Sequence, residues 1–107
     1  MAIQIDYNDE VYTLGFSRRT IQQMEKQGFV LEEVMSKPAT LVPMFFKGAF
    51  LMHHPRIREE VVNEIFKNLP NKDDLLVALI EEYQAPLNAM FDEPDETDEK
   101  KGSWKKI

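Results

Sequence analysis

The sequence contains no cysteine, and this absence excludes several classes of protein at once. Without cysteine there is no disulfide framework, no thiolate nucleophile and no cysteine-based zinc site. Glycine is scarce too, and its four residues are scattered, so there is no glycine-rich phosphate-binding loop. The longest apolar-rich run, residues 41–52, is interrupted by Lys47 and is too short to cross a bilayer. The N-terminus lacks the basic and apolar regions of a signal peptide, so we expect a cytoplasmic protein.

Clustered basic charge is also missing. The net charge is −6, and residues 1–91 hold 13 of the 19 acidic side chains but only 9 of the 13 basic ones. Nonspecific binding to nucleic acid or to an anionic membrane depends on clustered lysine and arginine. The two small clusters, Arg18 with Arg19 and Arg56 with Arg58, are too small for this purpose. We therefore expect neither nucleic acid nor membrane to be a partner.

The length and composition predict one folded domain with a tail. A chain of 107 residues has room for one hydrophobic core, and 43% hydrophobic residues is ordinary for a globular domain. We expect a single, mostly helical domain over residues 1–91 and a charged, flexible tail over residues 92–107. The tail contains six acids, four lysines and Trp104, which is the only tryptophan of the chain.

The first sixteen residues predict a β-hairpin. Residues 3–7 alternate apolar and polar side chains, residues 8–10 are turn formers, and residues 11–16 form a second candidate strand. The expected apolar face consists of Ile3, Ile5, Tyr7, Tyr12, Leu14 and Phe16. A lone hairpin is marginally stable, so this face must pack on other elements.

The rest of the body predicts helices, with start and stop signals at most of their ends. Ser17 is a good N-cap and Gly28 a natural stop for a helix over 18–27. A short helix over 31–36 should end at Pro38. A helix is expected over 41–54, with Thr40 as its cap and Pro43 in its first turn. Two more helices are expected over 56–69 and 73–90. Asn71 should cap the last one, and Pro86 should cause a kink or break near Gln84. The predicted class is α+β, mostly α: an N-terminal β-hairpin packed on a four- to five-helix body, with a disordered C-terminal tail.

Nothing in the sequence predicts an enzyme, and we name no catalytic residue, metal ligand or cofactor. His53 and His54 are adjacent, and adjacent helical side chains point about 100° apart, so they rarely bind one metal. The carboxylate pairs lie beside apolar stripes, where a solvated face is expected.

Residues 41–54 are the second informative element, because apolar side chains cover most of the expected helix. Such a helix is buried on several sides. Two interpretations stay open: the helix serves the core alone, or part of it also contacts a partner, for which flexible methionine is well suited. Trp104 adds a candidate anchor in the tail. The candidate partner-binding residues are Met44, Phe45, Phe46, Phe50, Met52 and Trp104.

In its ordered layout the chain resembles the small tail assembly chaperones of long-tailed bacteriophages (siphophages) and of related prophages of Gram-positive hosts. The resemblance covers most of the chain, and each motif alone is weakly specific. The segments that carry it are the hairpin Ile3–Tyr7 with Tyr12–Ser17, the helix end Met24–Gly28, the apolar segment Pro43–Phe50, the step His54–Ile57 with the Glu-rich helix after it, and the charged end Lys100–Trp104.

This resemblance implies a non-enzymatic protein of the host cytoplasm, absent from the mature virion. It would bind the tape-measure protein, keep it soluble during tail assembly, and form homo-oligomers. The family also implies a longer product made by −1 ribosomal frameshift, for which Glu99-Lys100-Lys101 can be encoded by a slippery run. The longer form would bring the major tail protein as a possible partner. The alternative function, suggested by net acidity, is an acidic inhibitor that mimics nucleic acid and binds a nuclease or regulator.

Overall fold

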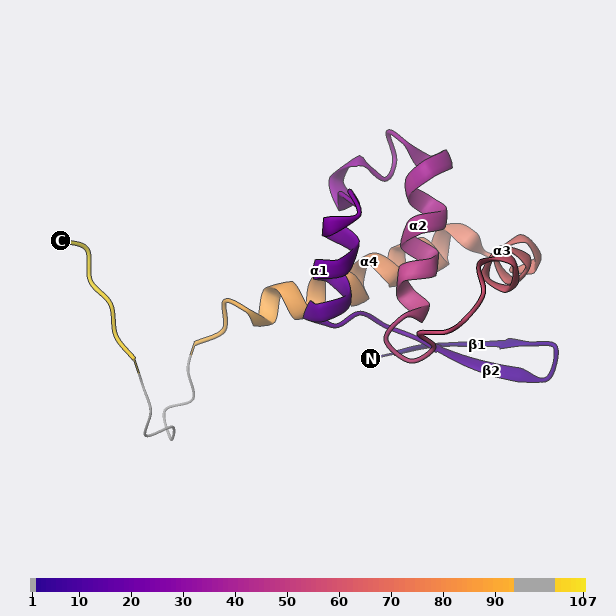
Figure 1. Cartoon of the computed structure of the whole chain (residues 1–107), viewed down its shortest axis with the longest axis horizontal. Coiled ribbons are helices and arrows are strands. Elements are labelled where there is room, and N and C mark those ends of the chain that lie inside the picture. The colour runs from indigo at the N-terminus through magenta and orange to yellow at the C-terminus, as the bar shows by residue number, and fades with distance from the viewer. Residues whose placement is uncertain (1, 94–101) are drawn as a thin grey trace.

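The chain folds into a two-stranded hairpin followed by helices that stack over it (Figure 1). The computed structural model describes residues 2–93 and 102–107. The predicted class, α+β and mostly α, is confirmed. The elements of the described residues are β1 (Ile3–Tyr7), β2 (Glu10–Leu14), α1 (Arg18–Lys26), the 3-10 helix η1 (Leu31–Glu33), α2 (Pro38–Phe50), α3 (Glu59–Asn68) and α4 (Lys72–Ala89).

The hairpin closes through a two-residue loop. Tyr7 pairs with Glu10, and the loop residues Asn8 and Asp9 have φ angles of 50° and 63°. Positive φ at both loop residues is the requirement of a type I′ turn, which asparagine and aspartate tolerate. The predicted hairpin is confirmed, although its second strand begins one residue earlier than expected and ends two residues earlier. Its register pairs Ile5 with Tyr12, so the predicted apolar residues do share one face.

The hairpin is fastened to the end of α2 along the outer edge of β2. The backbone N–H of Thr13 donates a hydrogen bond to Nε2 of His54, at 3.0 Å. One step further, the N–H of Gly15 donates to the carbonyl of Ala49, at 2.9 Å. A strand edge leaves alternate N–H groups without a partner, and here α2 and the segment after it supply the acceptors. His54 thus holds the hairpin in place.

Helix α1 follows its sequence signals closely. The hydroxyl of Ser17 accepts a hydrogen bond from the backbone N–H of Thr20, and the hydroxyl of Thr20 accepts one from the N–H of Ser17. This reciprocal pair is a capping box. At the other end Gly28 has a φ of 94°, a conformation that few other residues adopt without strain.

Helix α2 begins earlier than predicted and also ends earlier. Pro38 was expected to end the preceding helix, but it occupies the first turn of α2, where its missing N–H costs nothing. Thr40 therefore lies inside the helix instead of capping it, and Pro43 lies in the helix interior instead of the first turn. The helix ends at Phe50, and residues 51–53 continue as turns that lead to His54.

Helices α3 and α4 also differ from expectation at their ends. Helix α3 starts at Glu59, three residues late, because residues 56–58 belong to the connecting loop. Asn71 does take the N-cap position of α4, but with a φ of 54° and no side-chain capping bond. Helix α4 continues through Pro86 to Ala89, so the predicted break does not occur. One proline near a helix end removes a single hydrogen bond, and the helix tolerates this.

The core is centred on α2, as the distribution of its apolar residues predicted. Phe45 stacks between Phe16 and Phe29, with ring centroids 5.4 and 5.3 Å away, and Tyr83 of α4 meets it edge-on at 5.7 Å. On another side Phe46 contacts Phe66 of α3, at 4.9 Å. These ring pairs join the segments on either side of α1, together with α3 and α4, to a single central helix.

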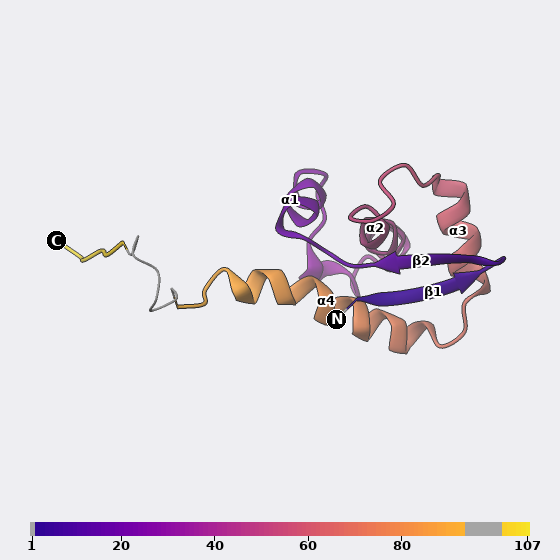
Figure 2. The same cartoon turned by 90° about the horizontal axis from the view of Figure 1, so that it is seen from below.

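The C-terminal end of α4 projects past the other helices (Figures 1 and 2). Its last apolar residues are therefore exposed, and the side chain of Phe91 retains 84% of its accessible surface. Residues 94–101, which include half of the predicted flexible tail and the Glu99-Lys100-Lys101 segment, lie outside the described residues. Within the described part of the chain, no helix combines the length and apolar content needed to cross a membrane.

Candidate partner-binding site

The six predicted partner-binding residues fall into two groups. Phe45, Phe46 and Phe50 are fully buried and form the core around α2. In this fold no partner reaches them, and they act as packing residues. The accessible ones are Met44, which is half-buried, and Met52 and Trp104, which are exposed.

Met44 lines a groove of about 500 Å³ between α1, α2 and the loop after α2, which we call the α2 groove. Methionines from both helices contribute to it, and the loop supplies further apolar side chains. Lys47 and Glu59 provide one charge of each sign at its margin. The apolar residues of this lining are Met24, Pro43, Met44, Leu51, Pro55 and Ile57.

Gly48 gives the α2 groove its close helix contact. A Cβ atom at this position would lie 2.5 Å from Sδ of Met24 and 2.6 Å from its Cε. Only glycine therefore lets the Met24 side chain lie against the backbone of α2. A glycine inside an apolar helix indicates that another group comes close to the helix backbone. The sequence did not indicate which group, because Met24 belongs to another helix.

A second groove, of about 450 Å³, lies between the end of α1, η1 and α4, and we call it the η1–α4 groove. Phe29, Leu31, Tyr83 and Leu87 line it, together with Glu25 and Glu32, and its lining contains no basic residue. Burial, followed by the negative charges of Glu25 and Glu32, raises the pKa of the Tyr83 hydroxyl to about 12. The environment is thus apolar and electronegative, and the sequence analysis missed it.

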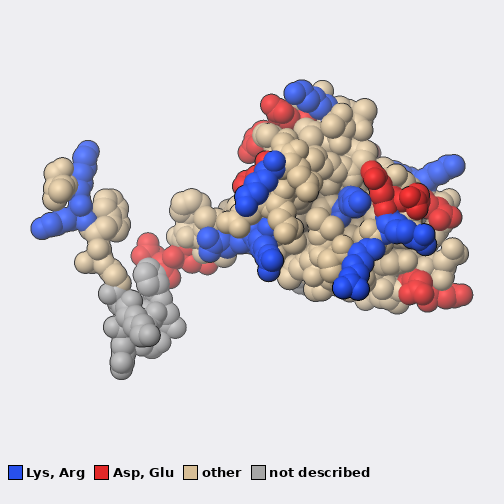
Figure 3. Space-filling model, in the orientation of Figure 1, with Lys and Arg blue, Asp and Glu red and all other residues tan. Residues whose placement is uncertain are grey.

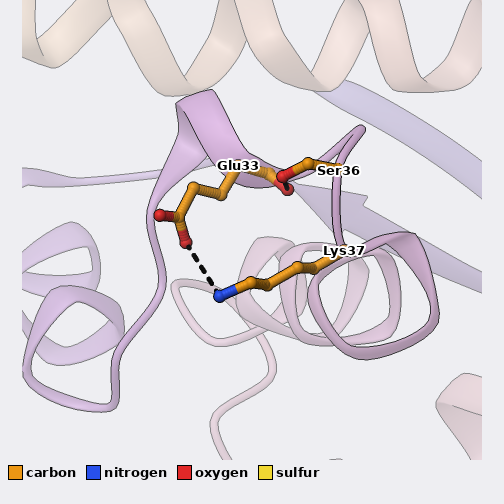
Figure 4. Close-up of polar contacts among 3 residues, drawn as sticks. All are labelled: Glu33, Ser36 and Lys37. Atoms are coloured by element: carbon orange, nitrogen blue, oxygen red, sulfur yellow. Dashed lines mark hydrogen bonds and ion pairs between the residues drawn. The ribbon is translucent and has the colours of Figure 1, made fainter.

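Two neighbouring glutamates of η1 have different roles. Glu33 turns toward Lys37, and its carboxylate lies 3.7 Å from the ammonium group, while the Ser36 hydroxyl donates to the Glu33 carbonyl (Figure 4). Both side chains of the ion pair are exposed, so it contributes little to stability. Glu32, by contrast, lines the η1–α4 groove.

The charged surface on one face of the molecule is mixed in sign. On the face in Figure 3, lysine and arginine side chains alternate with acidic ones over the body. A nucleic-acid mimic needs a dense array of acids, and this face has none.

The two histidines, expected to be structural, have separate positions in the structure. His54 uses the lone pair of Nε2 to accept from Thr13, so its ring proton is on Nδ1. His53 is exposed. Among the described residues, no group of three or more histidine, aspartate or glutamate side chains is arranged to hold a metal ion.

Comparison with protein families places the chain in the family described as a domain of unknown function, DUF5055, whose model matches residues 1–106. The chain belongs to this family. Neither the curated proteins nor the solved structures contain a match to it.

Proposed function

We propose that this DUF5055 chain is a non-enzymatic tail assembly chaperone of a bacteriophage or prophage. It binds the tape-measure protein and keeps it soluble while the tail is assembled. The structural observation that carries the proposal is the α2 groove, in which six apolar side chains lie beside the polar ones of Gln27, Thr40, Lys47 and Glu59. It adds to the ordered resemblance along the sequence.

The α2 groove suits an amphipathic helical partner. Such a helix presents apolar side chains at i, i+3 and i+4, and these fit a groove lined by apolar residues. Met44, which is half-buried, can adjust its side chain to different contacts along a long partner. The net charge of −6 keeps the protein soluble while the groove is occupied.

In this role the protein acts in the host cytoplasm, associates with copies of itself and leaves before the virion is mature. A longer frameshift product would carry a second domain able to contact the major tail protein. The acidic-inhibitor alternative rests on net charge alone, and the mixed charges in Figure 3 do not favour it.

The test is co-expression with the tape-measure protein encoded at the same locus, followed by measurement of its soluble fraction. We expect the wild type to raise this fraction. Met44→Glu and Leu51→Glu, which put a charge into the α2 groove, should abolish the gain. Met35→Glu is the matched control, because Met35 is 79% exposed and lies outside both grooves.

Circular dichroism must show that all three variants are folded. A tape-measure protein that is equally insoluble with and without the wild type would overturn the proposed function. If the groove variants keep the tape measure soluble as well as Met35→Glu does, the function stands but the binding surface is misplaced.

A further inference from the structure

The η1–α4 groove is an acidic, aromatic-floored site that the proposed function does not use. Glu25 and Glu32 line it without a compensating base, whereas the α2 groove contains Lys47. Phe29 and Tyr83, whose ring centroids are 5.5 Å apart, form its buried floor, and the accessible apolar side chains of its lining are Val30, Leu31 and Leu87. A site of this kind favours an occupant that carries an aromatic or aliphatic anchor beside positive charge.

The C-terminal segment, residues 102–107, has these properties. Trp104 and Ile107 are separated by Lys105 and Lys106, and the segment contains no acid. The side chain of Trp104 is 90% exposed, so most of a large aromatic surface faces solvent in this conformation. Aromatic anchors flanked by charge dominate the energetics of many interfaces.

The chain is also long enough to bring this segment to the groove. Leu87, near the end of α4, lines the groove, so the chain leaves the body beside it. Trp104 follows Phe91 by thirteen residues, a length that spans up to about 45 Å when extended.

We propose that residues 102–107 dock into the η1–α4 groove of their own chain, with Trp104 against Val30, Leu31 and Leu87 and the lysines beside Glu25 and Glu32. The structure then represents the open form, and the docked form covers the groove. The inference does not depend on the tape-measure function, because it concerns a different groove and a different ligand.

Trp104 is the only tryptophan, so its fluorescence in the full chain reports docking directly. We expect emission at shorter wavelength and several-fold weaker acrylamide quenching than for free N-acetyltryptophanamide at low salt. Salt at about 1 M, where charges are screened within roughly 3 Å, should move both signals toward the free value. Dilution should change neither signal, because docking within one chain is independent of concentration.

The key variant is Glu25→Lys with Glu32→Lys, both at exposed positions, which reverses the charge of the groove. Each reversal should weaken docking by roughly two- to fivefold, the size expected for partly exposed ion pairs. The control is Glu60→Lys with Glu81→Lys, which changes the net charge equally at exposed positions outside the groove. This control should keep the wild-type fluorescence.

Three results would overturn the proposal. If acrylamide quenches Trp104 as strongly as it quenches the free compound at low salt, the segment does not dock. Protection that disappears on dilution would assign the segment to the groove of a second copy. Protection that survives in the Glu25→Lys, Glu32→Lys variant would place the docking site elsewhere.

Discussion

The α2 groove and the η1–α4 groove differ in charge, in the flexibility of their walls and in their relation to the core. Methionine and one charge of each sign line the α2 groove, while aromatic rings and two glutamates line the η1–α4 groove. Phe29 and Tyr83 are held by ring contacts with Phe45, whereas Met24 lies against a glycine. One small core thus supports an adaptable neutral surface and a more rigid acidic one. The two should respond to different substitutions.

The largest effect is expected from Phe45→Ala. This side chain is fully buried and contacts Phe16, Phe29 and Tyr83, so its removal leaves a cavity beneath the η1–α4 groove. We expect a loss of about 3–5 kcal/mol in the free energy of unfolding, measured by urea titration followed by circular dichroism. Phe91→Ala is the control, because that ring is 84% exposed, and it should change stability by no more than about 0.5 kcal/mol. Equal effects of the two substitutions would contradict the assignment of Phe45 to the core.

A smaller effect on stability, but a larger one on binding, is expected from Gly48→Ala. The added methyl group would meet Sδ and Cε of Met24, which must then turn toward the α2 groove and fill it. Crowding destabilises the protein by about 1–3 kcal/mol, and the higher helix propensity of alanine offsets about 1 kcal/mol of this loss. The net loss should stay below about 2 kcal/mol, while the soluble fraction of the tape-measure protein falls and Trp104 fluorescence stays unchanged.

A double-mutant cycle isolates this contact. A Met24→Ala background removes the two side-chain atoms that lie within 3 Å of the new methyl group, so Gly48→Ala should stabilise the protein there by up to about 1 kcal/mol. A substitution that destabilises equally in both backgrounds would show that Gly48 is required for another reason.

The accuracy of the sequence analysis depended on how local each signal was. The hairpin and α1 were predictable, because the Asn8-Asp9 turn, the Ser17 cap and the Gly28 stop act within a few residues of themselves. The prediction for Pro38 was wrong because a proline can either end one helix or begin the next, and local sequence does not distinguish the two. The choice is made by packing of α2 against the rest of the core.

The candidate site shows the same limit. Met44 was predicted because methionine and phenylalanine are dense in its segment, and the structure places all three phenylalanines of that segment in the core. The Gly48–Met24 contact and the meeting of Glu25, Glu32 and Tyr83 join residues from different helices. No periodicity within one helix specifies which side chains of another helix will face it.

The smallest effect at neutral pH, and the one most specific to the η1–α4 groove, is expected from Tyr83→Phe. Burial, followed by the charges of Glu25 and Glu32, raises the pKa of Tyr83 from 10.0 to about 12 in the folded protein. Below pH 10 the hydroxyl is neutral in both states, and its contribution to stability is fully present. Between pH 10 and 12 the unfolded chain loses this proton first, so stability falls as pH rises. Urea titrations at several pH values from about 8 to 11.5 should therefore show a steeper loss for the wild type than for Tyr83→Phe. The contribution of Tyr7, whose pKa is also raised, is common to both proteins and cancels. Identical slopes would mean that the Tyr83 hydroxyl is well solvated and that the groove lacks the apolar, electronegative environment that distinguishes it from the α2 groove.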